Sequence, residues 1–116
     1  MLVVAQGEIG RSYNIGGENE RSNLQLVHTL CAILDKARPK PQGSYADQIT
    51  FVPDRPGHDA RYAIDPARIR KELGWRPSVT VEEGLERTVE WYLANEDWWR
   101  ALQNRAGVGQ RLGVKA

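Results

Sequence analysis

Apolar residues recur at helical spacing in two stretches of the chain. The first stretch predicts a helix from residue 22 to about residue 35 with one buried face, and the capping box Ser22-Asn23-Leu24-Gln25 marks its start. The second predicts a helix over residues 81–95, which begins after the capping box Thr80-Val81-Glu82-Glu83. The apolar positions that define the two faces are Leu24, Val27, Leu30, Cys31 and Leu34 in the first helix, and Val81, Leu85, Val89 and Tyr92 in the second.

Shorter helical segments are also predicted. Asp65-Pro66 provides a side-chain acceptor at a helix cap and a proline at the first helical position, and Gly74 ends the helix that follows. Residues 96–105 are expected to form another helical segment. The apolar residues 2–5 lack a polar cap, so they fit the end of a helix, a frayed terminus or a short edge segment, and composition leaves these alternatives open.

Three segments carry the pattern of short strands. Residues 11–15 alternate polar and apolar side chains, residues 49–52 are rich in β-branched and aromatic side chains, and residues 61–64 place two apolar side chains on one face. Prolines and a glycine at residues 53–57 stop the second strand. We therefore expect an α/β fragment, a mixed α+β unit with a small sheet of two or three short strands and three or four helices.

The 116 residues are expected to form one small domain, because a second full domain does not fit in this length. We assign residues 1–105 to one folded unit that is incomplete at its N-terminal side, and residues 106–116 to a flexible tail. Residues 107–113 superficially resemble a dinucleotide-binding fingerprint. Their spacing is wrong and no strand precedes them, so no cofactor site is assigned there.

Charge and composition exclude several classes of function. Sixteen Lys and Arg against fifteen Asp and Glu give a net charge of +1, so no global field attracts nucleic acid or an anionic membrane. Cys31 is the single cysteine, which excludes an internal disulfide and fits the cytoplasm. No apolar run approaches the roughly twenty residues that a membrane-spanning helix requires. We therefore expect a soluble cytoplasmic protein with no nucleic-acid or membrane partner.

The loop Asp54-Arg55-Pro56-Gly57-His58-Asp59 brings a guanidinium, an imidazole and two carboxylates together in a segment stiffened by proline. Arg55 offers a two-pronged donor to a phosphate, and Gly57 allows close backbone approach. Asp54 or Asp59 can orient the arginine or accept hydrogen bonds from sugar hydroxyls. On spacing alone, an ordinary surface turn with a local ion pair is at least as good an interpretation.

A second candidate anion site lies where the Gly16-Gly17 loop leads to the first long helix. Free backbone N–H groups and the helix dipole favour an anion at a helix N-terminus, and the side-chain amide of Asn23 can donate a hydrogen bond there. Plain helix capping explains Asn23 equally well.

No catalytic or metal centre stands out in the sequence. His28 and His58 are too isolated to bind a metal ion without carboxylate help. The acids at 82, 83 and 86 follow the dipole preference of a first helical turn, so they indicate a solvated face and not a catalytic pair. The four tryptophans are more typical of a core or an interface than of a stacking platform for nucleic acid. We assign no catalytic, cofactor-binding or metal-binding residue within the chain.

Four blocks of the sequence closely resemble dTDP-glucose 4,6-dehydratases, which are extended short-chain dehydrogenases. The second block is highly specific, and the resemblance covers about residues 7 to 99. The blocks are Tyr13-Asn14-Ile15-Gly16-Gly17-Glu18-Asn19-Glu20, Asp54-Arg55-Pro56-Gly57-His58-Asp59-Ala60-Arg61-Tyr62-Ala63-Ile64-Asp65, Glu72-Leu73-Gly74-Trp75-Arg76-Pro77 and Thr88-Val89-Glu90-Trp91-Tyr92-Leu93-Ala94-Asn95.

The resemblance implies that residues 1–105 are the C-terminal, nucleotide-sugar-binding part of a two-domain lyase. In that family, NAD held by an N-terminal Rossmann domain oxidises C4 of dTDP-glucose. Water then leaves across C5 and C6 and the hydride returns to C6, which gives dTDP-4-keto-6-deoxyglucose for deoxysugar biosynthesis such as that of rhamnose. The catalytic Tyr and Lys and the NAD site belong to the other part, so this chain alone is expected to be inactive, and the complete enzyme is expected to be a homodimer.

The family also implies which residues contact the substrate, mainly at its diphosphate. By position they are Asn23, Asp54, Arg55, Pro56, Gly57 and His58. A tyrosine that often precedes the family's Gly-rich ending has no match in residues 106–113, so a contact from such a tyrosine is not expected.

Two other functions stay open at this point. One is a free-standing module that binds nucleotide sugars or a partner without catalysis, and the other is a purely structural or interaction domain. A portion of the dehydratase is expected to expose apolar surface and to self-associate, whereas a free-standing module is expected to be a closed monomer.

Overall fold

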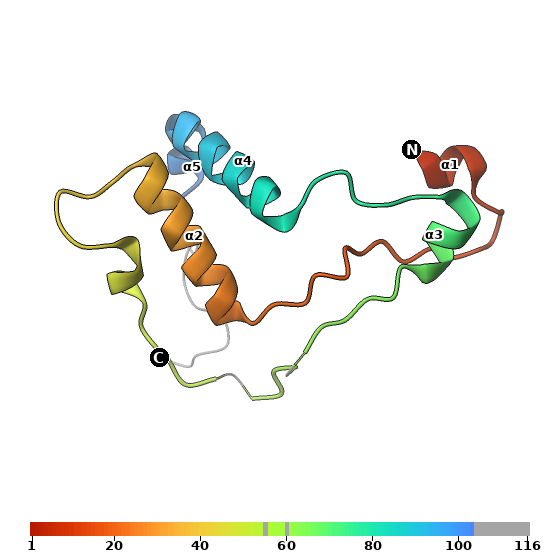
Figure 1. Ribbon diagram of the computed structural model, residues 1–116, viewed down its shortest axis with the longest axis horizontal. Coiled ribbons are helices and arrows are strands. Elements are labelled where there is room, and N and C mark those ends of the chain that lie inside the picture. The colour runs from red at the N-terminus through yellow and green to blue at the C-terminus, as the bar shows by residue number, and fades with distance from the viewer. Residues whose placement is uncertain (55, 60, 104–116) are drawn as a thin grey trace.

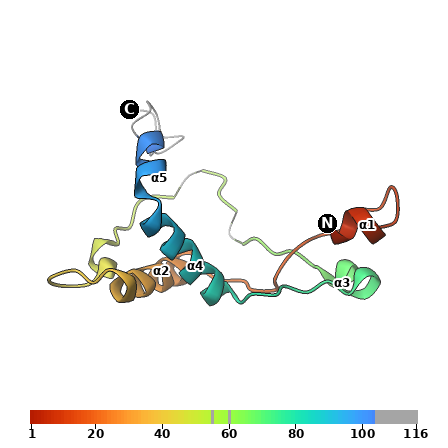
Figure 2. The same ribbon diagram turned by 90° about the horizontal axis from the view of Figure 1, so that it is seen from above.

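The computed structural model describes residues 1–54, 56–59 and 61–103. Two groups of helices lie at opposite ends of the molecule, and extended segments connect them (Figure 1, Figure 2). Helices α2 (Asn23–Ala37), α4 (Val81–Ala94) and α5 (Glu96–Gln103) form one group with the 3₁₀ helix η1 (Tyr45–Gln48). Helices α1 (Leu2–Gln6) and α3 (Ala67–Leu73) form the other. No helix in the described ranges is long and apolar enough to cross a membrane.

The helix boundaries follow the capping residues. The Ser22 hydroxyl accepts from the backbone of Gln25, whose side chain accepts from the backbone of Ser22, so the predicted capping box opens α2. Thr80 caps α4 by accepting from the backbone N–H of Glu83, but the Glu83 side chain pairs with Arg87, so only one of the two bonds of the predicted capping box is seen. Asp65 accepts from the backbone N–H of Ala67 at the start of α3, and Pro66, which was expected at the first helical position, is the cap residue one position earlier. These helices are confirmed.

Gly74 ends α3 in the left-handed conformation, with φ of 66°. We expect Gly74→Ala to lower the free energy of unfolding by about 1 kcal/mol, because a side chain at this φ is strained. A Cβ atom there meets no other atom within 4 Å, so the cost comes from the backbone alone. Urea unfolding followed by tryptophan fluorescence measures it. Gly17→Ala is the matched control, and an equal loss in both variants would contradict the prediction.

The prediction of a small sheet is wrong. The described residues contain no strand, and they contain five α-helices and one 3₁₀ helix in place of the three or four helices expected. Segments 11–16 and 61–66 approach each other near Asn14 and Asp65, but side chains and not a backbone ladder connect them in the described residues. Asn14 donates to the Asp65 carbonyl over 3.3 Å, and Arg68 donates to the Ser12 carbonyl over 3.0 Å. Alternating polarity predicts an extended chain, but a strand also needs a neighbour in register.

The core is small. Among the described residues only Cys31, Pro66, Ile69 and Val89 are buried. The radius of gyration is 18.5 Å, whereas a compact chain of this length has about 13 Å. Large apolar side chains remain exposed: Val4, Ile9, Ile15, Leu24, Val27, Phe51, Val52, Tyr62, Ile64, Trp91, Tyr92 and Trp98 are among them.

The carboxylate of Asp35 joins α2 to the loop that carries η1. It accepts from the Ser44 hydroxyl over 2.5 Å and from the backbone N–H of Tyr45 over 2.9 Å. The Tyr45 hydroxyl in turn donates to the carbonyl of Arg38 at the end of α2. The Ser44 bond, followed by the Tyr45 bond, holds the pKa of Asp35 below its ordinary value.

Acid is expected to weaken this junction. Because the pKa of Asp35 is lower in the folded chain than in the unfolded chain, its contribution to stability is present above the ordinary carboxyl pKa of about 3.9. The contribution is lost as the pH falls through the lower, folded value. Urea unfolding at several pH values should show a larger loss of stability on acidification for the wild type than for Asp35→Asn. Parallel curves for the two proteins would contradict this assignment.

Candidate functional site

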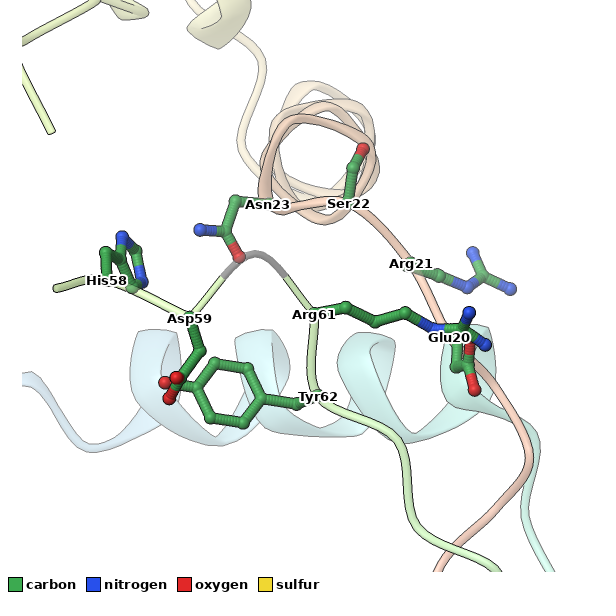
Figure 3. Close-up of a pocket in the computed structure, with 8 residues that line it drawn as sticks. All are labelled: Glu20, Arg21, Ser22, Asn23, His58, Asp59, Arg61 and Tyr62. Carbon is green, nitrogen blue, oxygen red and sulfur yellow. The ribbon is translucent and has the colours of Figure 1, made fainter.

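A hollow of about 450 Å³ lies between the start of α2 and the chain that leads back toward α3 (Figure 3). Two stretches far apart in the sequence line it, one on each side. The lining residues are Glu20, Arg21, Ser22, Asn23, His58, Asp59, Arg61 and Tyr62. The segments that the sequence singled out, the entrance to α2 and the proline-containing loop, therefore meet at one place.

A second hollow of about 600 Å³ adjoins the first and is more apolar. Asn23 and His58 line both hollows, so they stand at the boundary between them. Leu24 and Val27, which the sequence placed on the buried face of the helix, are 42% and 39% exposed and face this second hollow. Its other lining residues are Ile49, Thr50, Phe51, Val52, Pro53 and Asp54.

Asn23 is the first residue of α2 and does not cap it. Ser22 makes the capping hydrogen bond, which leaves the Asn23 amide available for another partner. Figure 3 shows the Ser22 side chain directed away from the hollow and the Asn23 amide directed into it. The capping role that the sequence left open for Asn23 therefore belongs to Ser22.

The loop after residue 53 turns sharply at Pro56 and Gly57. Gly57 has φ of 69°, and a Cβ atom built on it meets no atom within 4 Å, so the backbone conformation and not crowding favours glycine. The turn brings His58 back to Asp54, and the His58 Nδ1 lies 2.6 Å from an Asp54 carboxylate oxygen. Arg55, the predicted phosphate ligand, lies outside the described residues.

Two arginines that line the hollow are already paired with acids. Arg61 forms an ion pair with Glu20 across the two sides of the hollow, and Arg21 forms one with Glu82 of α4. A backbone hydrogen bond, followed by the bond from Arg21, holds the pKa of Glu82 below its ordinary value. These ion pairs connect the two lining segments to each other and to α4.

The sequence indicated no binding role for Arg21, Arg61 or Tyr62. The available signal was their position, because Arg61 and Tyr62 follow the loop directly and Arg21 precedes the α2 cap. Tyr62 is 66% exposed and adds a flat apolar surface to the hollow.

The hollow presents side chains suited to binding. It presents an amide, an imidazole and a phenol ring, which are suited to phosphate, hydroxyl and ring contacts. In the part of the chain that the structure describes, no three His, Cys, Asp or Glu residues gather as a metal site would require.

The chain has close relatives among the 4,6-dehydratases of nucleotide sugars. The sequence model of the family described as GDP-mannose 4,6 dehydratase matches residues 2–88, and the chain belongs to this family. Proteins named dTDP-glucose 4,6-dehydratase are close relatives. The one from Neisseria meningitidis is 53% identical over 97% of this chain, and the one from Salmonella typhimurium is 57% identical over 90% of it. The resemblance inferred from the sequence blocks is confirmed.

A solved structure supports the same relationship. The crystal structure of dTDP-glucose 4,6-dehydratase from Bacillus anthracis in complex with NAD matches 87% of this chain with a TM-score of 0.72 and 40% identity. The match covers 29% of that protein. The chain spans about a third of the length of the curated relatives it matches, 32% for the Neisseria protein and 29% for the Salmonella protein.

Proposed function

We propose that this chain is the substrate-binding portion of a dTDP-glucose 4,6-dehydratase. The observation that carries the proposal is the meeting of Asn23 and His58 in one hollow, since family resemblance implies a substrate contact for both. The identity of about half the residues with named dTDP-glucose 4,6-dehydratases supports the choice of nucleotide sugar.

In this function the chain binds and orients the substrate. The Asn23 amide and the His58 ring contact the diphosphate and neighbouring groups of dTDP-glucose, and Arg55 supplies the fixed positive charge. Pro56 and Gly57 set the shape of the loop that carries these side chains.

The redox step belongs to NAD, which supplies the hydride chemistry when it is bound. We assign the NAD site and the catalytic Tyr and Lys to the part of the relatives that these residues do not match. The complete enzyme is then a cytoplasmic homodimer, and this portion alone does not turn over substrate.

A segment exchange tests the proposal. Residues 1–103 replace the matching third of the Neisseria meningitidis enzyme, which is 53% identical over 115 residues. We expect the exchanged enzyme to bind NAD and to convert dTDP-glucose to the 4-keto-6-deoxy product. A soluble, NAD-loaded exchange enzyme that forms no product would contradict the proposal.

A titration separates the dehydratase portion from a free-standing binding module. Calorimetry with dTDP and the isolated chain is expected to show no tight binding, because in the enzyme the remaining part completes the site. Micromolar affinity of the isolated chain, equivalent to about −8 kcal/mol, would favour the module.

A further inference from the structure

The contact between Asp54 and His58 is short and local. The two residues are four positions apart, and the Pro56-Gly57 turn between them reverses the chain. His58 Nδ1 lies 2.6 Å from the Asp54 Oδ1. The His58 side chain is 28% exposed and that of Asp54 is 75% exposed, so the ring is the more enclosed partner.

This contact determines where the imidazole proton sits. An ionised carboxylate only accepts hydrogen bonds, so the ring nitrogen facing it must carry hydrogen. Nδ1–H therefore donates to Asp54, and Nε2 is left as the ring nitrogen available to a ligand. In the neutral ring Nε2 accepts a hydrogen bond from a hydroxyl, and in the protonated ring it donates to a phosphate oxygen.

His58 lies where the choice of protonated ring nitrogen affects ligand binding. It lines both hollows together with Asn23, and Figure 3 shows the Asn23 amide on the side of the hollow where His58 lies. The orientation and protonated nitrogen of one ring therefore influence the contacts available on both sides of the boundary.

We propose that Asp54 is a positioning residue that fixes the orientation and tautomer of His58 through Nδ1 and directs Nε2 to the ligand. This assignment modifies the role expected for Asp54 from its motif, where it was a direct substrate contact. The use of Nε2 by a nucleotide sugar rests on the proposed function, whereas the Nδ1–H tautomer does not.

The tautomer is tested directly in the isolated chain by nitrogen-15 NMR of the imidazole rings at alkaline pH. His58 of the wild type is expected to be the Nδ1–H tautomer, whereas Asp54→Ala is expected to shift it toward the Nε2–H tautomer that free imidazole side chains prefer. Asp54→Asn keeps an acceptor oxygen and is expected to retain Nδ1–H. His28 on α2 is the internal control and should not change. The same His58 tautomer in the wild type and in Asp54→Ala would overturn the proposal.

The consequence for binding is tested in the segment-exchange enzyme. Asp54→Ala is expected to raise the KM for dTDP-glucose about tenfold, the scale of losing a group that orients a ligand-binding histidine, and to change kcat much less. Asp54→Asn is expected to restore most of this loss. An unchanged KM in Asp54→Ala, or equal losses in both variants, would overturn the positioning role. An inactive wild-type exchange enzyme would instead contradict the proposed function and leave the NMR result standing.

Discussion

Ile69→Ala is expected to lower the free energy of unfolding by about 2 to 5 kcal/mol, the usual cost of truncating a buried isoleucine. Ile69 is 1% exposed and lies on α3, which packs against α1. Because the described residues contain few buried side chains, each one carries a large share of the packing. The loss should remove much of the stability of the α1 and α3 group.

Ile9→Ala provides a matched control for this measurement. Ile9 is 100% exposed, so the same loss of atoms there should change stability by no more than about 0.5 kcal/mol. Urea unfolding of both variants, followed by circular dichroism, gives the comparison. Equal effects of the two substitutions would show that Ile69 is not part of a packed core.

Arg55→Ala in the segment-exchange enzyme is expected to weaken binding of dTDP-glucose by about 1.5 to 3 kcal/mol, the scale of a hydrogen bond to a charged group. The dissociation constant should rise by about ten- to over a hundredfold. A guanidinium keeps its charge at any working pH, and its donors match the paired oxygens of a phosphate. Arg55→Lys keeps the charge but loses the two-pronged geometry, so an intermediate loss is expected.

Arg87→Ala is the control for a general loss of positive charge. Arg87 lies on α4, pairs with Glu83 over 3.0 Å and does not line either hollow around Asn23. Its substitution should leave substrate binding unchanged. If Arg55→Ala behaves like Arg87→Ala, Arg55 does not contact the substrate.

The helices could be predicted because their signals are local. Ser22, Thr80 and Asp65 each satisfy backbone groups within three residues of themselves, so the capping pattern alone locates the start of a helix. The sheet could not be predicted in the same way. A strand at residues 11–15 depends on a pairing partner elsewhere, and no alternation of side chains supplies one.

The candidate site was predictable in part for the same reason. The sequence identified the Asn23 and His58 segments separately, but only the fold shows that they meet. The pairing of Arg61 with Glu20 spans about forty residues of sequence, which no local pattern reveals. The contact between Asp54 and His58 could have been predicted from the sequence, because the Pro56-Gly57 turn brings together the residues on either side of it.

Segments 11–16 and 61–66 approach each other without forming a ladder, and this has a consequence for handling the protein. Among the described residues, no backbone N–H of one segment donates to a carbonyl of the other, and the bonds that join the two come from the Asn14 and Arg68 side chains. Extended backbone in this state is a template for strand addition, and Ile15 and Ile64 beside it are exposed apolar side chains. At high concentration, chains of this kind join edge to edge, so aggregation should begin at these segments and not at the helices.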